Sequence, residues 1–66
     1  MEIVLNGEPR DVAEGTSVAQ LLGDMGLAQK RLALEINREI VPRSTFETRR
    51  LAAGDSVEIV HAIGGG

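Results

Sequence analysis

The residues of this chain best placed to do chemistry are the last three, Gly64-Gly65-Gly66. Glycine has no Cβ atom, so such a run can lie extended where any side chain would clash. The group it would present is the α-carboxylate of Gly66, an anion at neutral pH that needs activation by a partner enzyme before a nucleophile can attack it. A frayed end is the plain alternative. The glycines follow directly on a strand pattern without linker composition, and this context favours the functional interpretation.

Other chemically useful groups are few. His61 is the only histidine, and a lone histidine on a strand is more often a surface or rim residue than a base. The sequence holds no nucleophile–base pair, phosphate-binding glycine loop or histidine pair of recognised spacing. Cysteine is absent, which excludes thiol catalysis and disulfides and agrees with a reducing compartment. We therefore expect no catalytic residue, no metal site, no bound cofactor and no enzymatic activity.

Length and charge restrict the class of protein further. A chain of 66 residues can build one small core and hence a single domain. Its net charge of -3 argues against nucleic acid or an anionic membrane as a partner. The pairs Lys30-Arg31 and Arg49-Arg50 are expected to be solvated, although they could steer an acidic partner. The first residues turn polar too soon for a signal peptide or a membrane span, so a cytoplasmic location is expected.

The elements that must position the tail begin with a hairpin and a helix. Alternating apolar residues in positions 1–6 predict a strand, Asn6-Gly7 predicts a tight turn, and residues 8–12 return as an edge strand because of Pro9. Ser17 and Gln20 have the spacing of a capping box. The helix they begin carries one apolar stripe and should end at Gly26, with Leu27 in contact behind it; its stripe is Val18, Leu21, Leu22 and Met25. Gly23 inside this helix is explained only by close packing against the sheet.

The second half of the chain predicts three more strands. Residues 32–37 alternate, Arg38-Glu39 reads as a tight turn, and Ile40-Val41 is a short edge strand stopped by Pro42. Ser44 is a possible cap for a single helical turn, with Phe46 and Leu51 holding that turn to the core. Residues 56–62 form the last strand, with Val57 and Ile59 inward.

This order, ββαββ with a closing strand, predicts an α+β fold in which one main helix packs on one face of a mixed sheet. The opposite face is then partly solvated. Val4, Ala33 and Val60 should lie on it, and a shallow apolar patch of this kind is a candidate partner surface.

The whole chain resembles the ThiS family of sulfur-carrier proteins of thiamine biosynthesis. The resemblance is carried by the opening residues 3–8, the helix entry Thr16-Ser17-Val18 with Leu21-Leu22, residues 37–43, the turn Gly54-Asp55 and the terminal Gly65-Gly66. It implies a β-grasp, ubiquitin-like fold, which agrees with the strand and helix order. We accordingly divide the chain into a β-grasp domain, residues 1–63, and a flexible glycine tail, residues 64–66.

The resemblance also implies a mechanism and partners. The carboxylate of Gly66 would be adenylated with ATP by a ThiF-type activating enzyme and converted to a thiocarboxylate by a sulfur donor system. The thiocarboxylate would then deliver sulfur to thiazole synthase (ThiG). Gly64 and Gly65 would thread into the partner, with Gly65 the more demanding position, and Val60, Ala62 and Ile63 would form the docking site at the base of the tail.

Three other interpretations stay open at this point. A MoaD-like carrier for molybdopterin synthesis shares the glycine ending, although the segment Ile40-Val41-Pro42-Arg43 favours thiazole synthesis. A ubiquitin-like modifier, joined through its carboxylate to a lysine of a target, shares the activation step. A small binding module with an inert end is the third, and it predicts that removal of Gly65 and Gly66 changes nothing.

Overall fold

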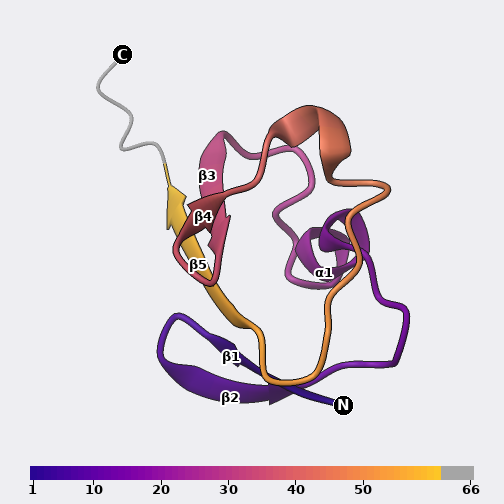
Figure 1. The fold of residues 1–66 in the computed structure, drawn as a ribbon. Helices are drawn as coiled ribbons and strands as arrows, with labels where there is room; N and C mark the ends of the chain where they lie inside the picture. Colours follow the sequence, from indigo (N-terminus) through magenta and orange to yellow (C-terminus); the bar gives the residue numbers. More distant parts are fainter. Residues whose placement is uncertain (62–66) are drawn as a thin grey trace.

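The structure, a computed structural model, describes residues 1–61 of the chain. Within these residues five strands form one sheet in the order β2-β1-β5-β3-β4, and the helix α1 lies beside one face of it (Figure 1). This arrangement confirms the predicted α+β class. The boundary predicted between residues 63 and 64 lies outside the described residues. The elements are β1 (Glu2–Leu5), β2 (Glu8–Asp11), α1 (Val18–Asp24), β3 (Leu32–Ile36), β4 (Glu39–Ile40), the 3-10 helix η1 (Arg43–Thr45) and β5 (Ser56–His61).

The hairpin of β1 and β2 forms where the Asn-Gly signal predicted it. Asn6 has φ 49° and Gly7 has φ 84°, and positive φ at both central residues is what a tight hairpin turn of the I′ type requires. β2 is an edge strand, as Pro9 predicted, because a proline cannot donate a ladder hydrogen bond. The ladder runs from Leu5–Glu8 back to Glu2–Asp11.

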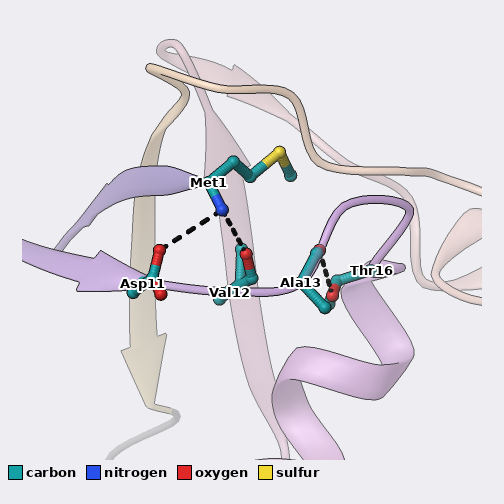
Figure 2. A network of polar contacts seen from close by, with 5 residues as sticks. All are labelled: Met1, Asp11, Val12, Ala13 and Thr16. Carbon is teal, nitrogen blue, oxygen red and sulfur yellow. Dashed lines mark hydrogen bonds and ion pairs between the residues drawn. The ribbon is translucent and has the colours of Figure 1, made fainter.

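The open end of this hairpin is fastened by the N-terminal residue. The Met1 ammonium donates to the Val12 carbonyl at 2.6 Å and lies 3.3 Å from Oδ1 of Asp11 (Figure 2). In the same view the Thr16 hydroxyl donates to the Ala13 carbonyl at 2.6 Å, which closes the turn that leads into α1. Backbone groups that would otherwise be orphaned between β2 and α1 are thereby satisfied.

Both ends of α1 follow the sequence signals. The Ser17 amide donates to Oε1 of Gln20 at 2.8 Å, and the Gln20 amide donates to Oγ of Ser17 at 3.1 Å, which is the predicted capping box. At the other end Gly26 has φ 74°, and the Leu27 amide donates to the Leu22 carbonyl at 2.7 Å, as in a Schellman motif. The predicted helix end is therefore confirmed.

Gly23 does not have the packing role expected of it. A Cβ atom at this position would meet no neighbour within 4 Å, so close packing against the sheet is the wrong explanation for this glycine.

The turn between β3 and β4 lies one residue earlier than predicted. Asn37 and Arg38 occupy it with φ 51° and 70°, while Glu39 already pairs with Ile36 in β4. Asn37 is held there because its Nδ2 donates to Oδ1 of Asp55 at 3.1 Å and its Oδ1 accepts from the Ser56 amide at 3.0 Å. β4 is the predicted short edge strand, although it ends at Ile40 and Val41 is buried instead.

The predicted single helical turn is present as η1, but the predicted Ser44 cap is wrong. Pro42 occupies the N-cap position without a side-chain hydrogen bond. The turn is closed instead by Thr45, whose amide and hydroxyl both donate to the Pro42 carbonyl, at 2.9 and 2.8 Å. Phe46 and Leu51 are buried behind it, as predicted.

One apolar core lies between α1 and the sheet, and every strand except the two edges contributes to it. Its residues pack as a single cluster with no buried side-chain polar atom left unpaired in the described part of the chain. The cluster consists of Ile3, Leu5, Val18, Leu21, Leu22, Leu34, Ile36, Val41, Phe46, Leu51, Val57 and Ile59.

Candidate functional site

The candidate site is the C-terminal end of β5 together with the sheet face beside it. β5 lies in the middle of the sheet, parallel to β1 and antiparallel to β3, and it leads directly into residues 62–66. The core on one side and β3, which pairs with β5 as far as His61, therefore hold the point from which the tail leaves. Of the predicted site residues the structure describes Val60; the others, Ala62, Ile63, Gly64, Gly65 and Gly66, lie outside the described residues.

The alternation of β5 separates core residues from presented residues. Val57 and Ile59 are buried beneath α1, whereas the Val60 side chain is 59% exposed on the opposite face. Its cross-strand neighbour on that face is Ala33, which is also exposed. These two residues form an apolar contact point near the end of β5, two residues before Ala62.

Sequence reasoning missed one large apolar residue on this face. Ile40 was expected to lie in an edge strand, but only the register of β4 places it directly opposite Glu35, with its side chain 72% exposed. The signal that could have found it is the alternation of residues 32–37, which places Glu35 and Asn37 outward. A residue paired with either of them across the turn faces the same side of the sheet, so the exposed face of Ile40 follows from the hairpin itself.

A second feature that sequence reasoning missed is a pair of facing carboxylates. Alternation alone places Glu35 in β3 and Glu58 in β5 on the outward side, but their direct opposition follows from the register of the two strands. Like charges directly opposite each other in a sheet are destabilising. No salt bridge to a cation relieves either carboxylate within residues 1–61.

We call the side of the sheet that faces away from α1 the outer face. Its outward strand positions hold apolar and acidic residues and one serine, and no lysine or arginine stands at such a position in the five described strands. Chemically it is a surface suited to a partner that brings apolar groups and cations. The outer face consists of Glu2, Val4, Pro9, Asp11, Ala33, Glu35, Ile40, Ser56, Glu58 and Val60.

Away from the outer face, an open hollow of about 520 Å³ lies between α1 and the segment before it. Its polar side chains include Thr16 and Gln20, which are already engaged in the turn and in the capping box. The ionisable residues of the lining are Glu14 and Asp24. The lining therefore holds no nucleophile paired with a base.

No cluster of three or more histidine, cysteine, aspartate or glutamate side chains suited to a metal ion occurs among residues 1–61. In the same part of the chain no helix has the length and apolar character needed to cross a bilayer.

Comparison with known proteins agrees with the arrangement of these elements. A sequence profile of the ThiS family matches residues 3–66. The sulfur carrier protein ThiS of Escherichia coli is 33% identical over 66 residues, which make up 100% of both chains. A crystal structure of a thiamine biosynthesis protein (ThiS) from Geobacter metallireducens has a TM-score of 0.86 to this structure at 35% identity, and the match covers 100% of each chain.

Larger proteins also match. A thiazole synthase of Paramagnetospirillum magneticum is 42% identical to this chain over 66 residues. The match covers 100% of this chain but only 20% of the synthase, so the chain spans about a fifth of that relative's length.

Proposed function

Since the chain belongs to the ThiS family and has its β-grasp fold, we propose that it carries sulfur for thiazole formation in thiamine biosynthesis. The carrier group is the carboxylate of Gly66. The observation that carries the proposal is the extent of the family match, which runs from residue 3 through the three glycines to residue 66.

The chemistry of the step explains why partners must do the work. A carboxylate repels nucleophiles, so a ThiF-type enzyme first joins the Gly66 carboxylate to the adenylyl group of ATP, with release of pyrophosphate. The resulting mixed anhydride has a good leaving group, and a sulfur nucleophile from the donor system replaces AMP to form a thiocarboxylate. In this scheme the carrier itself performs no catalysis and holds no cofactor; it supplies reach and a docking surface, and it acts in the cytoplasm.

The consumer of the thiocarboxylate in this proposal is thiazole synthase. Support comes from the Paramagnetospirillum magneticum synthase, which contains a stretch 42% identical to the whole of this chain. Docking uses the base of the tail, where Val60 is exposed beside Ala33 and is followed by Ala62 and Ile63. Gly64 and Gly65 then pass into the partner's active site, where a side chain at Gly65 is the less tolerated of the two.

Intact mass measurement tests the proposal. Incubation with a ThiF-type enzyme, ATP and a sulfur source should exchange one oxygen atom of the protein for sulfur, and fragmentation should place the exchange on Gly66. A matched variant that lacks Gly66 should fold normally, because the core of the described part of the chain lies within residues 3–59, and should show no exchange.

Three results would contradict the proposal that this chain carries sulfur for thiazole formation. An unchanged mass of the wild-type chain in the presence of an active adenylating enzyme would exclude it. An adduct linked to lysine would instead place the chain among ubiquitin-like modifiers. Sulfur delivery to molybdopterin rather than to thiazole in a reconstituted assay would favour the MoaD-like alternative.

A further inference from the structure

β5 has a different set of neighbours along its two halves. Its parallel ladder with β1 contains Val4–Ser56 and Leu5–Val57 and ends there. Its antiparallel ladder with β3 continues to Leu32–His61. Figure 1 shows β5 running on past the β1–β2 hairpin toward the C-terminal end. The last three residues of β5 therefore have a neighbouring strand on one side only, among the residues that the structure describes.

The hydrogen bonds at the start of β5 determine the directions in which the backbone N–H and C=O groups of Ile59, Val60 and His61 point. The Asn37 amide donates to the Ser56 carbonyl at 2.8 Å, on the β3 side, whereas the Asn6 amide donates to the Val57 carbonyl at 2.8 Å, on the β1 side. Successive residues of a strand direct their N–H and C=O groups to opposite sides. Ile59 and His61 therefore direct theirs to the β1 side, and Val60 directs its own to β3.

On the β1 side, the side chain of Asn6 takes the place of the missing strand for one residue. Its Oδ1 accepts the Ile59 amide at 2.8 Å, as a ladder carbonyl would. The next groups along this edge are the Ile59 carbonyl and the amide and carbonyl of His61, and no hydrogen bond from residues 1–61 reaches them. On this edge the Ile59 amide is therefore hydrogen-bonded, whereas the backbone groups that follow it are unpaired among residues 1–61.

The two edge strands of the sheet, β2 and β4, differ from this part of β5, because each has a feature that hinders pairing with another chain. β2 carries Pro9, which cannot donate, and β4 is only two residues long. Both devices prevent another chain from adding a strand. At the exposed half of β5 neither device is present: the residues are Ile59, Val60 and His61, none of which blocks pairing.

We propose that this edge of β5, from Ile59 to His61, receives an extended segment of thiazole synthase as an added strand. The inference rests on the proposed function, because a synthase that takes up the tail must approach the end of β5 from which the tail leaves. Main-chain hydrogen bonds to an open edge provide affinity in such complexes, and flanking side chains provide specificity. Here the flanking side chains are Val60 on the outer face and His61 on the other.

Amide hydrogen exchange of the full chain tests the added strand directly. In the free protein the Val60 amide, which pairs with Ala33, should exchange slowly, and the His61 amide should exchange quickly. Binding of thiazole synthase should slow exchange at His61 by at least about ten-fold. Unchanged exchange at His61 in a saturated complex would overturn the inference, as would slowing caused by the adenylating enzyme and not by the synthase.

Proline substitution gives a second, independent test. His61→Pro removes an amide that no hydrogen bond from residues 1–61 uses, so the folded chain should keep its thermal stability, whereas Val60→Pro removes a β3 ladder bond and should lower it. His61→Pro should weaken binding to the synthase by about ten-fold. The control His61→Ala, which keeps the amide, should bind within about two-fold of wild type. Equal binding by the proline and alanine variants would contradict the added strand.

These outcomes are separate from those that test the carrier function. If wild-type protein acquires the thiocarboxylate while the His61 amide stays unprotected by the synthase, the added strand is wrong and the carrier function stands. If the wild-type chain neither acquires sulfur nor binds the synthase, both proposals fail together.

Discussion

The inner face of the sheet is apolar wherever α1 covers it, whereas the outer face mixes exposed apolar side chains with carboxylates. Leu34 and Val57 on the inner side are almost completely buried, while Val60 and Ile40 on the outer side are mostly exposed. Neighbouring residues of one strand thus serve different purposes. The inner face provides the free energy of folding, and the outer face, with the open edge of β5, is what the folded chain offers to a partner.

The largest expected effect is the difference in stability between a substitution on the inner face and one on the outer face. Leu34→Ala should lower the free energy of unfolding by about 2–5 kcal/mol, because it leaves a cavity beneath α1 at a residue that is 1% exposed. Ile40→Ala, on the outer face, should change it by less than about 0.5 kcal/mol. Urea denaturation followed by circular dichroism measures both. Comparable losses in the two variants would show that the faces are not divided in this way.

The next effect concerns Asn6, which joins the hairpin turn to β5. Asn6→Ala removes the hydrogen bond to the Ile59 amide and places alanine, which has no side-chain amide to stabilise positive φ, at φ 49°. It should lower the free energy of unfolding by about 1–3 kcal/mol. Asn6→Gly tolerates positive φ but loses the hydrogen bond, so it should lower the free energy of unfolding by only about 0.5–1.5 kcal/mol. The difference between the two in denaturant unfolding isolates the backbone contribution. If glycine cost more than alanine, the turn geometry would not be what Asn6 provides.

A smaller effect is expected on α1, at a position that touches neither face of the sheet. Gly23→Ala should raise the free energy of unfolding by up to about 1 kcal/mol, since the new Cβ meets open space and alanine favours a helix. Gly26→Ala should lower it instead, because Gly26 has φ 74°. Thermal unfolding of the two variants should show shifts of opposite sign. A loss of stability in Gly23→Ala would indicate an unrecognised need for glycine there.

The smallest expected effect tests the facing carboxylates of the outer face. Glu58→Gln removes the repulsion with Glu35 and should stabilise the fold by about 0.2–1 kcal/mol at low salt, less as salt is added. Glu14→Gln, at an exposed turn outside the sheet, is the matched control and should have almost no effect. Equal changes in both variants at low ionic strength would mean that the opposition of Glu35 and Glu58 is energetically unimportant.

Local signals in the sequence were sufficient for the elements that depend on a few neighbouring residues. Asn6-Gly7 predicted a hairpin turn, Ser17 and Gln20 a capping box, and Gly26 a helix end, and each is present. The Ser44 cap was wrong because Pro42 takes the N-cap position and Thr45 closes the turn on the Pro42 carbonyl. The Arg38-Glu39 turn was wrong because its position depends on distant groups. Asn37 is held in its turn by Asp55 and Ser56, far along the chain.

By itself, then, the sequence determined the order of the elements, the composition of the core and the glycine ending, because alternation, caps and turns act within a few residues. Only the tertiary structure decided which strands pair beyond the hairpins, and in which register. That choice sets Glu35 against Glu58 and ends the β1 ladder at Leu5–Val57 while β5 continues. Register is a property of the whole packed core, since a shift of one residue would turn every buried side chain of a strand to the outer face.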